Sequence, residues 1–402
     1  MNRSTISSVR QAATAAKSQN KIRSARRRGG SSKLSKDELD RIFLSVGQQL
    51  REGHSSDAEK ILARALDSPS LDYDDLANLK RLLAFTLETV GRYHESLEAV
   101  NMFENEEMLA RLAPETHVRV ATQLAIAYNN LGDHPKAVTL LKETLAKARE
   151  QELRHLLGNI EIGLARVYRK LNECPISRDH AQNALNATRE TGDWLGMAEA
   201  YRELALSHHQ EGSSEKSLEY FGLGIQIIGE RSAPFMLGRL YSDMSGAYWF
   251  LRQASKGVEC LEKSIEFFGR TEHVLNSVIA YNNLGINLMA IGEWDRAEEV
   301  IHRALELATH SNHAHIAGIL DSLGEIKILR GRLNEARELL ERAVSVARQH
   351  KREWYEAQAM RNLARCQLAQ GEFKEAAATA RQTINLSGQI GDKHYANMAG
   401  LV

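Results

Sequence analysis

The 402-residue sequence predicts an all-α fold, a solenoid of about nine helix-turn-helix repeats. Turn-forming residues recur about every 40 residues, and small residues follow them at a fixed offset. Ala and Leu are abundant, whereas Pro numbers only 5 and aromatic residues only 6% of the chain. This composition favours helix throughout. An internal period of this length is typical of a solenoid, in which each unit packs only on its neighbours.

The repeat is defined by a few positions. Pairs of Leu and Gly stand eight residues apart, and a small residue follows each Gly by five: Leu124, Gly132 and Ala137; Leu204, Gly212 and Ser217; Leu284, Gly292 and Ala297; Leu363, Gly371 and Ala376. The same frame places the successive turns at Gly53, Gly91, Gly132, Asn172, Gly212, Arg252, Gly292, Gly331 and Gly371. Their spacing of 38 to 41 residues extends over nearly the whole chain.

Each position has a physical reason. Gly at the turn adopts the left-handed conformation that ends a helix, and the small residue lets two helices cross closely. Asn172 tolerates the left-handed region as well. Arg252 does not, so we expect its turn to be less regular than the others.

These positions resemble the tetratricopeptide repeat, whose signature is W-x2-L-G-x2-Y. The Tyr of that signature is kept at Tyr128, Tyr168 and Tyr248, and the resemblance covers residues 37–391. The period is similar to that of the long-repeat subclass in spindle-orientation adaptors, kinesin light chains and bacterial transcription regulators. The resemblance implies a right-handed α-solenoid whose first helices line a concave groove. It further implies a non-enzymatic scaffold that holds a peptide or protein segment there.

The resemblance also implies which side chains face the groove. They are Arg81, Arg119, Asn129, Arg166, Arg169, Lys170, Arg202, Arg239, Asn282 and Asn362. A guanidinium matches the geometry of carboxylates and phosphates, which favours an acidic or phosphorylated partner segment. Asn would hold the peptide backbone. The alternative is that the arginines pair with Glu on neighbouring helices.

Aromatic residues suggest a second kind of contact. Trp249 and Phe250 are either an apolar anchor for a ligand or packed against the neighbouring helix. Trp294 and Trp354 fall at joins between helices, where we expect core packing.

Catalysis, metal binding and cofactor binding are not predicted. The sequence has no Gly-rich phosphate loop, GxSxG or HExxH motif. His310, His313 and His315 are the main histidine cluster, but no acid flanks them as a further ligand. The three Cys are far apart and fit no CxxC pattern, which indicates a reducing compartment or no redox role. No apolar stretch is long enough to span a membrane.

The ends of the chain differ from the repeats. Residues 1–34 are predicted to be a disordered tail, and residues 1–36 carry ten Lys or Arg and no acid, leaving 42 basic against 52 acidic residues in the remainder. Nucleic acid or an anionic surface would bind only through this basic segment. We expect a cytoplasmic protein, with an organellar or nuclear address in the tail as the alternative. Residues 35–391 would form the solenoid, beginning with a capping box at Ser35 and Glu38. Residues 392–402 would be a capping helix or the start of a further unit.

A second function is open from the sequence. The array would instead be a sensory or regulatory module of a signal-transduction or transcription regulator, which binds an effector and controls an output domain.

Overall fold

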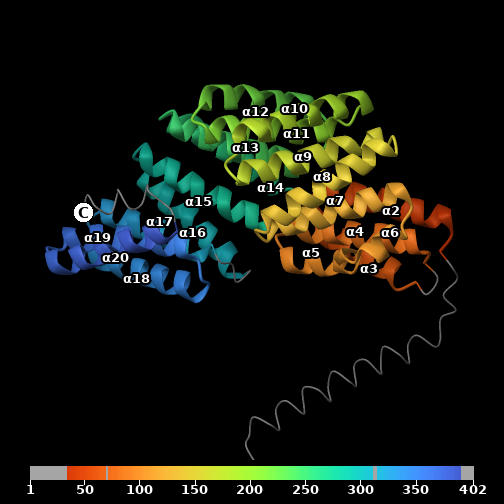
Figure 1. The fold of residues 1–402 in the computed structure, drawn as a ribbon. Coiled ribbons are helices and arrows are strands. Elements are labelled where there is room, and N and C mark those ends of the chain that lie inside the picture. Colours follow the sequence, from red (N-terminus) through yellow and green to blue (C-terminus); the bar gives the residue numbers. More distant parts are fainter. Residues whose placement is uncertain (1–33, 69–70, 311–314, 391–402) are drawn as a thin grey trace, which may run out of the picture.

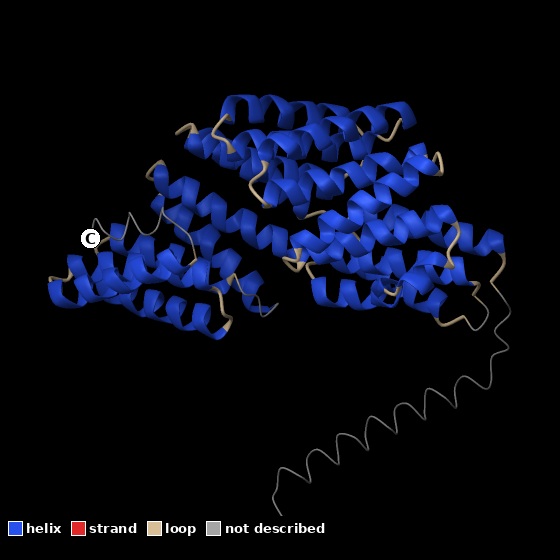
Figure 2. Ribbon diagram, in the orientation of Figure 1, coloured by secondary structure: helices blue, strands red, loops and turns tan. Residues whose placement is uncertain are grey.

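The computed structural model describes residues 34–68, 71–310 and 315–390. All regular secondary structure in these ranges is helical (Figure 2). The predictions for the basic tail, Leu34 aside, and for the C-terminal helix at 392–402 concern residues outside these ranges.

The described residues form nine helical hairpins stacked into a superhelix (Figure 1), which confirms the predicted α-solenoid. The first helices of the hairpins are α2 (Lys36–Glu52), α4 (Tyr73–Thr89), α7 (Pro114–Asn130), α9 (Arg154–Lys170), α11 (Trp194–Gln210), α13 (Pro234–Phe250), α15 (Val274–Ala290), α17 (Ile316–Leu329) and α19 (Glu353–Ala369). The second helices are α3 (Ser55–Leu66), α5 (Tyr93–Val100), α8 (His134–Glu150), α10 (Cys174–Thr191), α12 (Ser214–Ile228), α14 (Ala254–Phe268), α16 (Trp294–His310), α18 (Leu333–Gln349) and α20 (Phe373–Gln389).

All nine predicted turn residues have a positive φ. The expectation that the Arg252 turn would be irregular is wrong, because Arg252 takes φ 57° and the chain re-enters a helix at Ala254. The Arg252 amide donates to the Trp249 carbonyl at 3.0 Å, and the Gln253 amide donates to the Tyr248 carbonyl at 2.9 Å. These two hydrogen bonds satisfy the end of α13 as a Gly turn would, so they hold Arg252 in a backbone region that it would otherwise avoid.

The start of the solenoid agrees with the sequence, but the second hairpin departs from the repeat. The capping box is present, since the Glu38 amide donates to Ser35 Oγ and the Ser35 amide donates to Glu38 Oε2. In the second hairpin, helix α5 ends at Val100 and is followed by a short 3₁₀ helix, η1 (Asn101–Glu104), and by α6 (Glu106–Ala110). Asn105 caps α6 through its side chain, which accepts from the Met108 amide at 3.2 Å.

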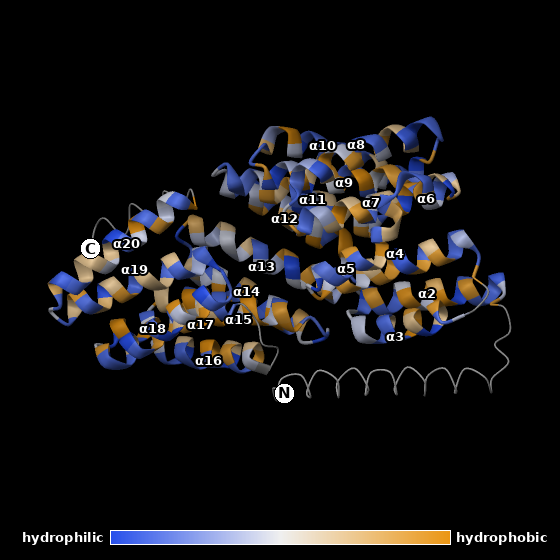
Figure 3. Cartoon of the chain, turned by 60° about the horizontal axis from the view of Figure 1, so that its bottom comes forward, coloured by the Kyte–Doolittle hydropathy of each residue, from blue (hydrophilic) through white to orange (hydrophobic). Residues whose placement is uncertain are grey.

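The core lies where the two helices of each hairpin cross. The small residues predicted for this crossing are buried: Ala137, Ser217, Ala297 and Ala376. Gly285 shows how tight the crossing is, because a Cβ added there would lie 2.2 Å from the Ile301 side chain. Apolar and polar stretches alternate along the helices (Figure 3), as expected for helices with one buried side.

Two of the tryptophans at helix joins do not belong to this core. Trp294 is 39% exposed and Trp354 is 46% exposed, so the expectation of core packing was wrong for both. A helix join lies at the edge of the stack, where neighbouring residues cover a large ring only in part.

The superhelix also returns on itself. Segment 271–275, which joins α14 to α15, contacts the turn after α2 and the turn after α4. In Figure 1, α13 to α15 accordingly lie beside the first two hairpins, while α17 to α20 extend away from them. This long-range contact gives the first six hairpins a closed arrangement, with their first helices toward the inside.

Candidate functional site: a polar cluster on the inner face

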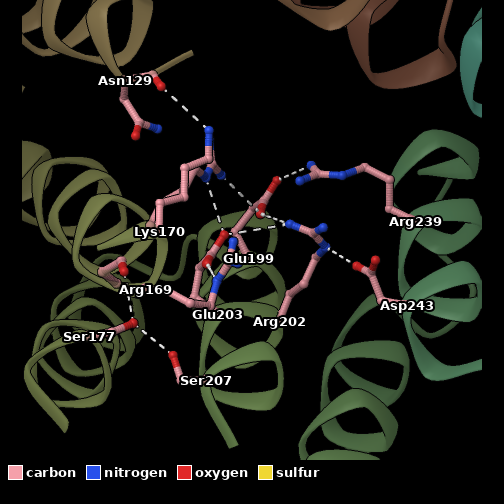
Figure 4. Close-up of polar contacts among 12 residues, drawn as sticks. Asn129, Arg169, Lys170, Ser177, Glu199, Arg202, Glu203, Ser207, Arg239 and Asp243 are labelled. Carbon is pink, nitrogen blue, oxygen red and sulfur yellow. Dashed lines mark hydrogen bonds and ion pairs between the residues drawn. The ribbon is translucent and has the colours of Figure 1, made fainter. Parts of the chain in front are cut away.

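An acid on α11 is the centre of a polar cluster on the inner face (Figure 4). The Glu203 side chain is 0% exposed and accepts hydrogen bonds from Arg166 Nε at 3.2 Å and from Arg169 Nε at 2.9 Å, both on α9. Arg202 Nη1 lies 3.5 Å from the same carboxylate. Three guanidinium groups therefore surround one buried acid.

The neighbouring acids extend the cluster to other helices. Glu199 accepts from Arg239 Nη1 at 2.5 Å and from Arg166 Nη2 at 3.4 Å, which joins α13, α11 and α9. Asp243 on α13 accepts from Arg202 Nε at 2.5 Å. We call the four arginines and their acids the inner-face cluster: Arg166, Arg169, Arg202, Arg239, Glu88, Glu199, Glu203 and Asp243.

The electrostatics of the cluster favour the charged forms. Burial alone would raise the pKa of Glu203, but Arg169, Arg166 and Arg202 lower it well below the ordinary Glu value. The pKa of Glu199 is lowered in the same way, since Arg239, Arg166 and Arg202 outweigh its burial. Every guanidinium in the cluster thus faces an ionised acid.

This geometry changes the meaning of four predicted residues. Arg166, Arg169, Arg202 and Arg239 lie on the inner face, but each forms an ion pair with an acid on another helix or on its own. These four arginines therefore follow the alternative to a free basic groove, in which they pair with neighbouring acids. An anionic partner would have to compete with these internal acids. Glu203 follows the predicted groove residue Arg202, and Asp243 follows Ser242, the equivalent position 40 residues later. Neither acid is itself a predicted groove position, so the sequence pattern did not identify them.

Arg81 on α4 behaves differently. Its Nε atom is buried and makes no hydrogen bond, and the structure shows no acid paired with it among the described residues. Burial, followed by repulsion from Arg119, lowers the pKa of the Arg81 guanidinium to about 10. Arg119 itself forms an ion pair with Glu115 at 2.7 Å. Arg81 is therefore a partly buried cation, with its Nε atom buried, that the described part of the chain leaves without a counter-charge.

Lys170 and the predicted asparagines lie in different surroundings. Lys170 Nζ donates to the Asn129 carbonyl at 3.4 Å, and burial with repulsion from Arg166 lowers the pKa of its ammonium. Asn129 Oδ1 accepts a hydrogen bond from His134 Nδ1 at 3.1 Å. Asn282 has a buried Oδ1 atom that makes no hydrogen bond.

Asn362 belongs to a second, smaller polar group near the C-terminal end. It is fully buried and donates to Asp321 Oδ1 at 2.8 Å, while Arg365 Nη1 donates to its Oδ1 at 2.9 Å. Arg365 also pairs with Glu325 at 2.8 Å. Burial raises the pKa of the Asp321 carboxyl to about 7. With its side chain fully buried and bonded within the chain, Asn362 is placed to stabilise α17 against α19.

The aromatic pair is placed on the surface. Phe250 is 65% exposed and Trp249 is 38% exposed, with an edge contact between the rings of Phe250 and His209 at 4.8 Å. Both residues stand at the end of α13, and the Phe250 ring meets α11 of the preceding hairpin.

Neither a metal site nor a membrane-spanning helix is found among the described residues. Within the described residues, no group of His, Cys, Asp and Glu has the arrangement of a metal site. The sequence cluster of His310, His313 and His315 falls largely outside what the structure describes. The helices of the described ranges include none long and apolar enough to cross a bilayer.

The fold and the inner face define a class: a helical repeat protein whose first helices present polar side chains toward a common interior. Models described as tetratricopeptide repeat match residues 118–150, 276–349 and 315–388. The resemblance predicted from the sequence is thereby confirmed, since these parts of the chain match tetratricopeptide repeats.

Solved structures with the same fold include regulators. The apo form of the quorum sensor NprR from B. thuringiensis has 15% identity and a TM-score of 0.61, covering 87% of this chain and 98% of that one. A Rap protein complexed with Competence and Sporulation Factor has 13% identity and a TM-score of 0.54, covering 81% and 96%. A Signal Transduction ATPase with Numerous Domains from Pyrococcus horikoshii, with a tetratricopeptide repeat sensor, has 14% identity and a TM-score of 0.60. It covers 91% of this chain, which spans 55% of that protein. The search of curated proteins gave no match.

Proposed function

We propose that this protein is a non-enzymatic interaction scaffold that holds an acidic segment of a peptide or protein on its inner face, with a carboxylate against Arg81. The observation that carries the proposal is the partly buried Arg81 guanidinium, which has a buried, unbonded Nε and no acid beside it among the described residues. A buried charge without a partner is costly, so a ligand that supplies the counter-charge gains affinity from Arg81.

The other residues of the inner face have separate roles in this proposal. Arg119 adds positive potential next to Arg81, and Lys170 does so at the end of α9. Asn282, whose Oδ1 makes no hydrogen bond within the described residues, bonds the ligand backbone in this proposal, whereas the Oδ1 of the buried Asn129 already bonds His134. Arg166, Arg169, Arg202 and Arg239 stabilise the arrangement of α9, α11 and α13 and do not bind the ligand directly, because internal acids already occupy them.

The neighbours with this fold support the class of function. One is named as a quorum sensor, and another was solved in complex with Competence and Sporulation Factor. The same helical architecture thus serves recognition in those proteins.

The test uses an array of short peptides in which each sequence with Asp or Glu has a counterpart with Asn or Gln. The full chain should select acidic members, and Arg81→Gln should weaken their binding roughly tenfold, the value of one charge-assisted hydrogen bond. Arg41→Gln is the matched control, since Arg41 is exposed on α2. Equal binding of acidic and amide peptides, or equal binding by the Arg81 and Arg41 variants, would refute the proposal.

A regulatory module is the second candidate, and the contact between segment 271–275 and the first two hairpins favours it. A ligand that alters this contact would change the overall shape and pass a signal to an output partner. Small-angle scattering with and without a peptide selected from the array tests this candidate. A change in radius of gyration on binding supports the regulatory module, whereas an unchanged profile supports the static scaffold.

A further inference from the structure

The turn after α2 is bonded to a segment more than 200 residues away. The Ser56 amide donates to Glu272 Oε2 at 2.7 Å, and Ser56 Oγ donates to Glu272 Oε1 at 2.9 Å. In the reverse direction, the Glu272 amide donates to the Gly53 carbonyl at 2.9 Å. The two backbones also approach closely, because a Cβ added to Gly53 would lie 2.5 Å from the Thr271 side chain.

The turn after α4 contacts the same segment. His273 Nδ1 donates to the Thr89 carbonyl at 3.0 Å, and burial lowers the pKa of His273 to about 4, so the ring is neutral with its proton on Nδ1. A Cβ at Gly91 would lie 3.3 Å from Leu275. Two consecutive hairpin turns therefore dock on segment 271–275.

This docking is not a property of the repeat itself. The turn glycines of five other hairpins have the same left-handed backbone, but a Cβ added to any of them would meet nothing within 4 Å: Gly132, Gly212, Gly292, Gly331 and Gly371. Left-handed geometry explains why all seven are Gly. The contacts at Gly53 and Gly91 are additional, and they exist only because the superhelix closes.

A continuous set of contacts connects the docking segment to the inner-face cluster. The His273 ring stacks on Phe235 of α13, with 3.9 Å between ring centroids. Phe235 in turn lies against the Arg239 guanidinium, 5.5 Å from the ring centroid, and Arg239 pairs with Glu199. Tyr93, just beyond the Gly91 turn, is close enough to Glu88, Arg239 and Arg166 to feel their charges. The docking thus connects the turn after α4 to the start of α13 through His273.

We propose that the docking of the Gly53 and Gly91 turns on segment 271–275 is a latch that closes the inner face and opens to admit a ligand to Arg81. The inference rests on the function proposed above, because it regulates access to the same site. The latch is held by a few hydrogen bonds, with Ser56 and Glu272 exposed to solvent. Adjacent hairpins, in contrast, share a buried apolar core. The latch is accordingly the interface that separates first, before any hairpin unfolds.

The experiment measures access to the inner face without a ligand. Ser242 on α13 stands in the same helical register as Arg202, 40 residues further along, and Ser242→Cys changes one atom. The native Cys174, Cys260 and Cys366 are buried, and the chain without the new Cys gives their background rate. Labelling by a bulky polyethylene-glycol maleimide is compared with labelling by iodoacetamide, which is small enough to enter without opening.

Two variants weaken the latch in this background. Gly53→Ala places a Cβ against Thr271, and Gly132→Ala is its matched control, because Gly132 has a similar φ of 91° against 85° and open space around it. Glu272→Ala removes both acceptors for Ser56 and leaves the hairpins untouched. Each latch variant should raise the rate of bulky labelling by roughly tenfold or more relative to iodoacetamide, because Glu272→Ala loses two charge-assisted hydrogen bonds and Gly53→Ala adds a clash with Thr271. Gly132→Ala should not raise it.

Hydrogen exchange separates opening from unfolding. In Glu272→Ala, the Ser56 amide should exchange faster, while amides within α9 and α10 should keep the wild-type rate. Equal bulky labelling of the wild type, Gly53→Ala and Glu272→Ala would overturn the latch. Because no ligand is used, the latch result stands even if the peptide array shows no preference for acidic sequences.

Discussion

Glu203 on α11 accepts hydrogen bonds from two arginines of α9, Arg166 at 3.2 Å and Arg169 at 2.9 Å. The two arginines are three residues apart, so one carboxylate holds two positions of the same helix face. This relationship turns residues that the sequence marks as binding groups into groups that fix α9 against α11.

Glu203→Gln should destabilise the protein by about 3 kcal/mol, because Arg169 loses its counter-charge and Arg166 keeps only its longer pairs with Glu199 and Glu88. Chemical denaturation of the full chain measures the effect. The control is Glu211→Gln, which removes a more exposed pair with Arg178 and should cost about 0.5 kcal/mol. Equal losses from the two variants would contradict a structural role for Glu203.

The ion pairs of Glu203 also predict how its contribution to stability varies with pH. Burial raises the pKa of Glu203, but Arg169 and Arg166 lower it by more than burial raises it, so the folded-state pKa lies below the unfolded-state pKa. The stabilisation is then complete above the ordinary Glu pKa and is lost only as the pH falls through the lower folded value. The difference in unfolding free energy between wild type and Glu203→Gln should therefore stay constant from pH 8 to pH 5.

Arg252→Gly should stabilise the protein by about 1 kcal/mol, since Arg252 has φ 57° and a side chain disfavours that region. Thermal unfolding monitored by circular dichroism gives the shift. Arg252→Ala is the matched control, because it removes the same side chain but retains the Cβ. If Ala stabilises as much as Gly, the long side chain and not the backbone conformation is the source of strain.

Asp321→Asn should make the protein less sensitive to rising pH. Burial raises the folded pKa of Asp321 to about 7, above its unfolded value. The stability that Asp321 contributes is thus present in full at low pH and is lost as the pH rises toward 7. From pH 5 to pH 8 the wild type should lose about 3 kcal/mol relative to Asp321→Asn, measured by urea denaturation at both values. A parallel pH dependence of the two proteins would argue against a buried, protonated Asp321.

Arg81→Met should stabilise the unliganded protein by about 2 kcal/mol, because it removes a buried charge that has no acid beside it and keeps the apolar stem. Arg41→Met on the exposed face of α2 is the control and should change stability little. Urea denaturation again gives the comparison. A loss of stability in Arg81→Met would mean that an internal partner already neutralises Arg81.

Most of the fold could be predicted because the repeat is local. The turn positions, the small residues at the crossings and the Ser35 cap depend on residues close in sequence, so spacing alone located them. The helix break at Asn101 and the regular turn at Arg252 were not predicted. There, local preference and the packing of the hairpin compete, and the sequence pattern does not show which prevails.

The candidate site was predicted by position but not by partner. The register of the first helices placed Arg81, Arg166 and Arg239 on the inner face. Whether each has an acid beside it depends on side chains about 40 residues away on a neighbouring helix, as with Arg239 and Glu199.

The sequence by itself determined the unit and its number of copies, because these follow from a period that repeats along the chain, whereas the inward face of each first helix was implied by the family resemblance. Only the tertiary structure decided that Arg81 alone among the inner arginines of α4 to α13 faces no acid, and that Glu272 meets Ser56. The physical reason is superhelical curvature. It accumulates small rotations over six hairpins, so it brings together residues such as Ser56 and Glu272 that no local pattern relates.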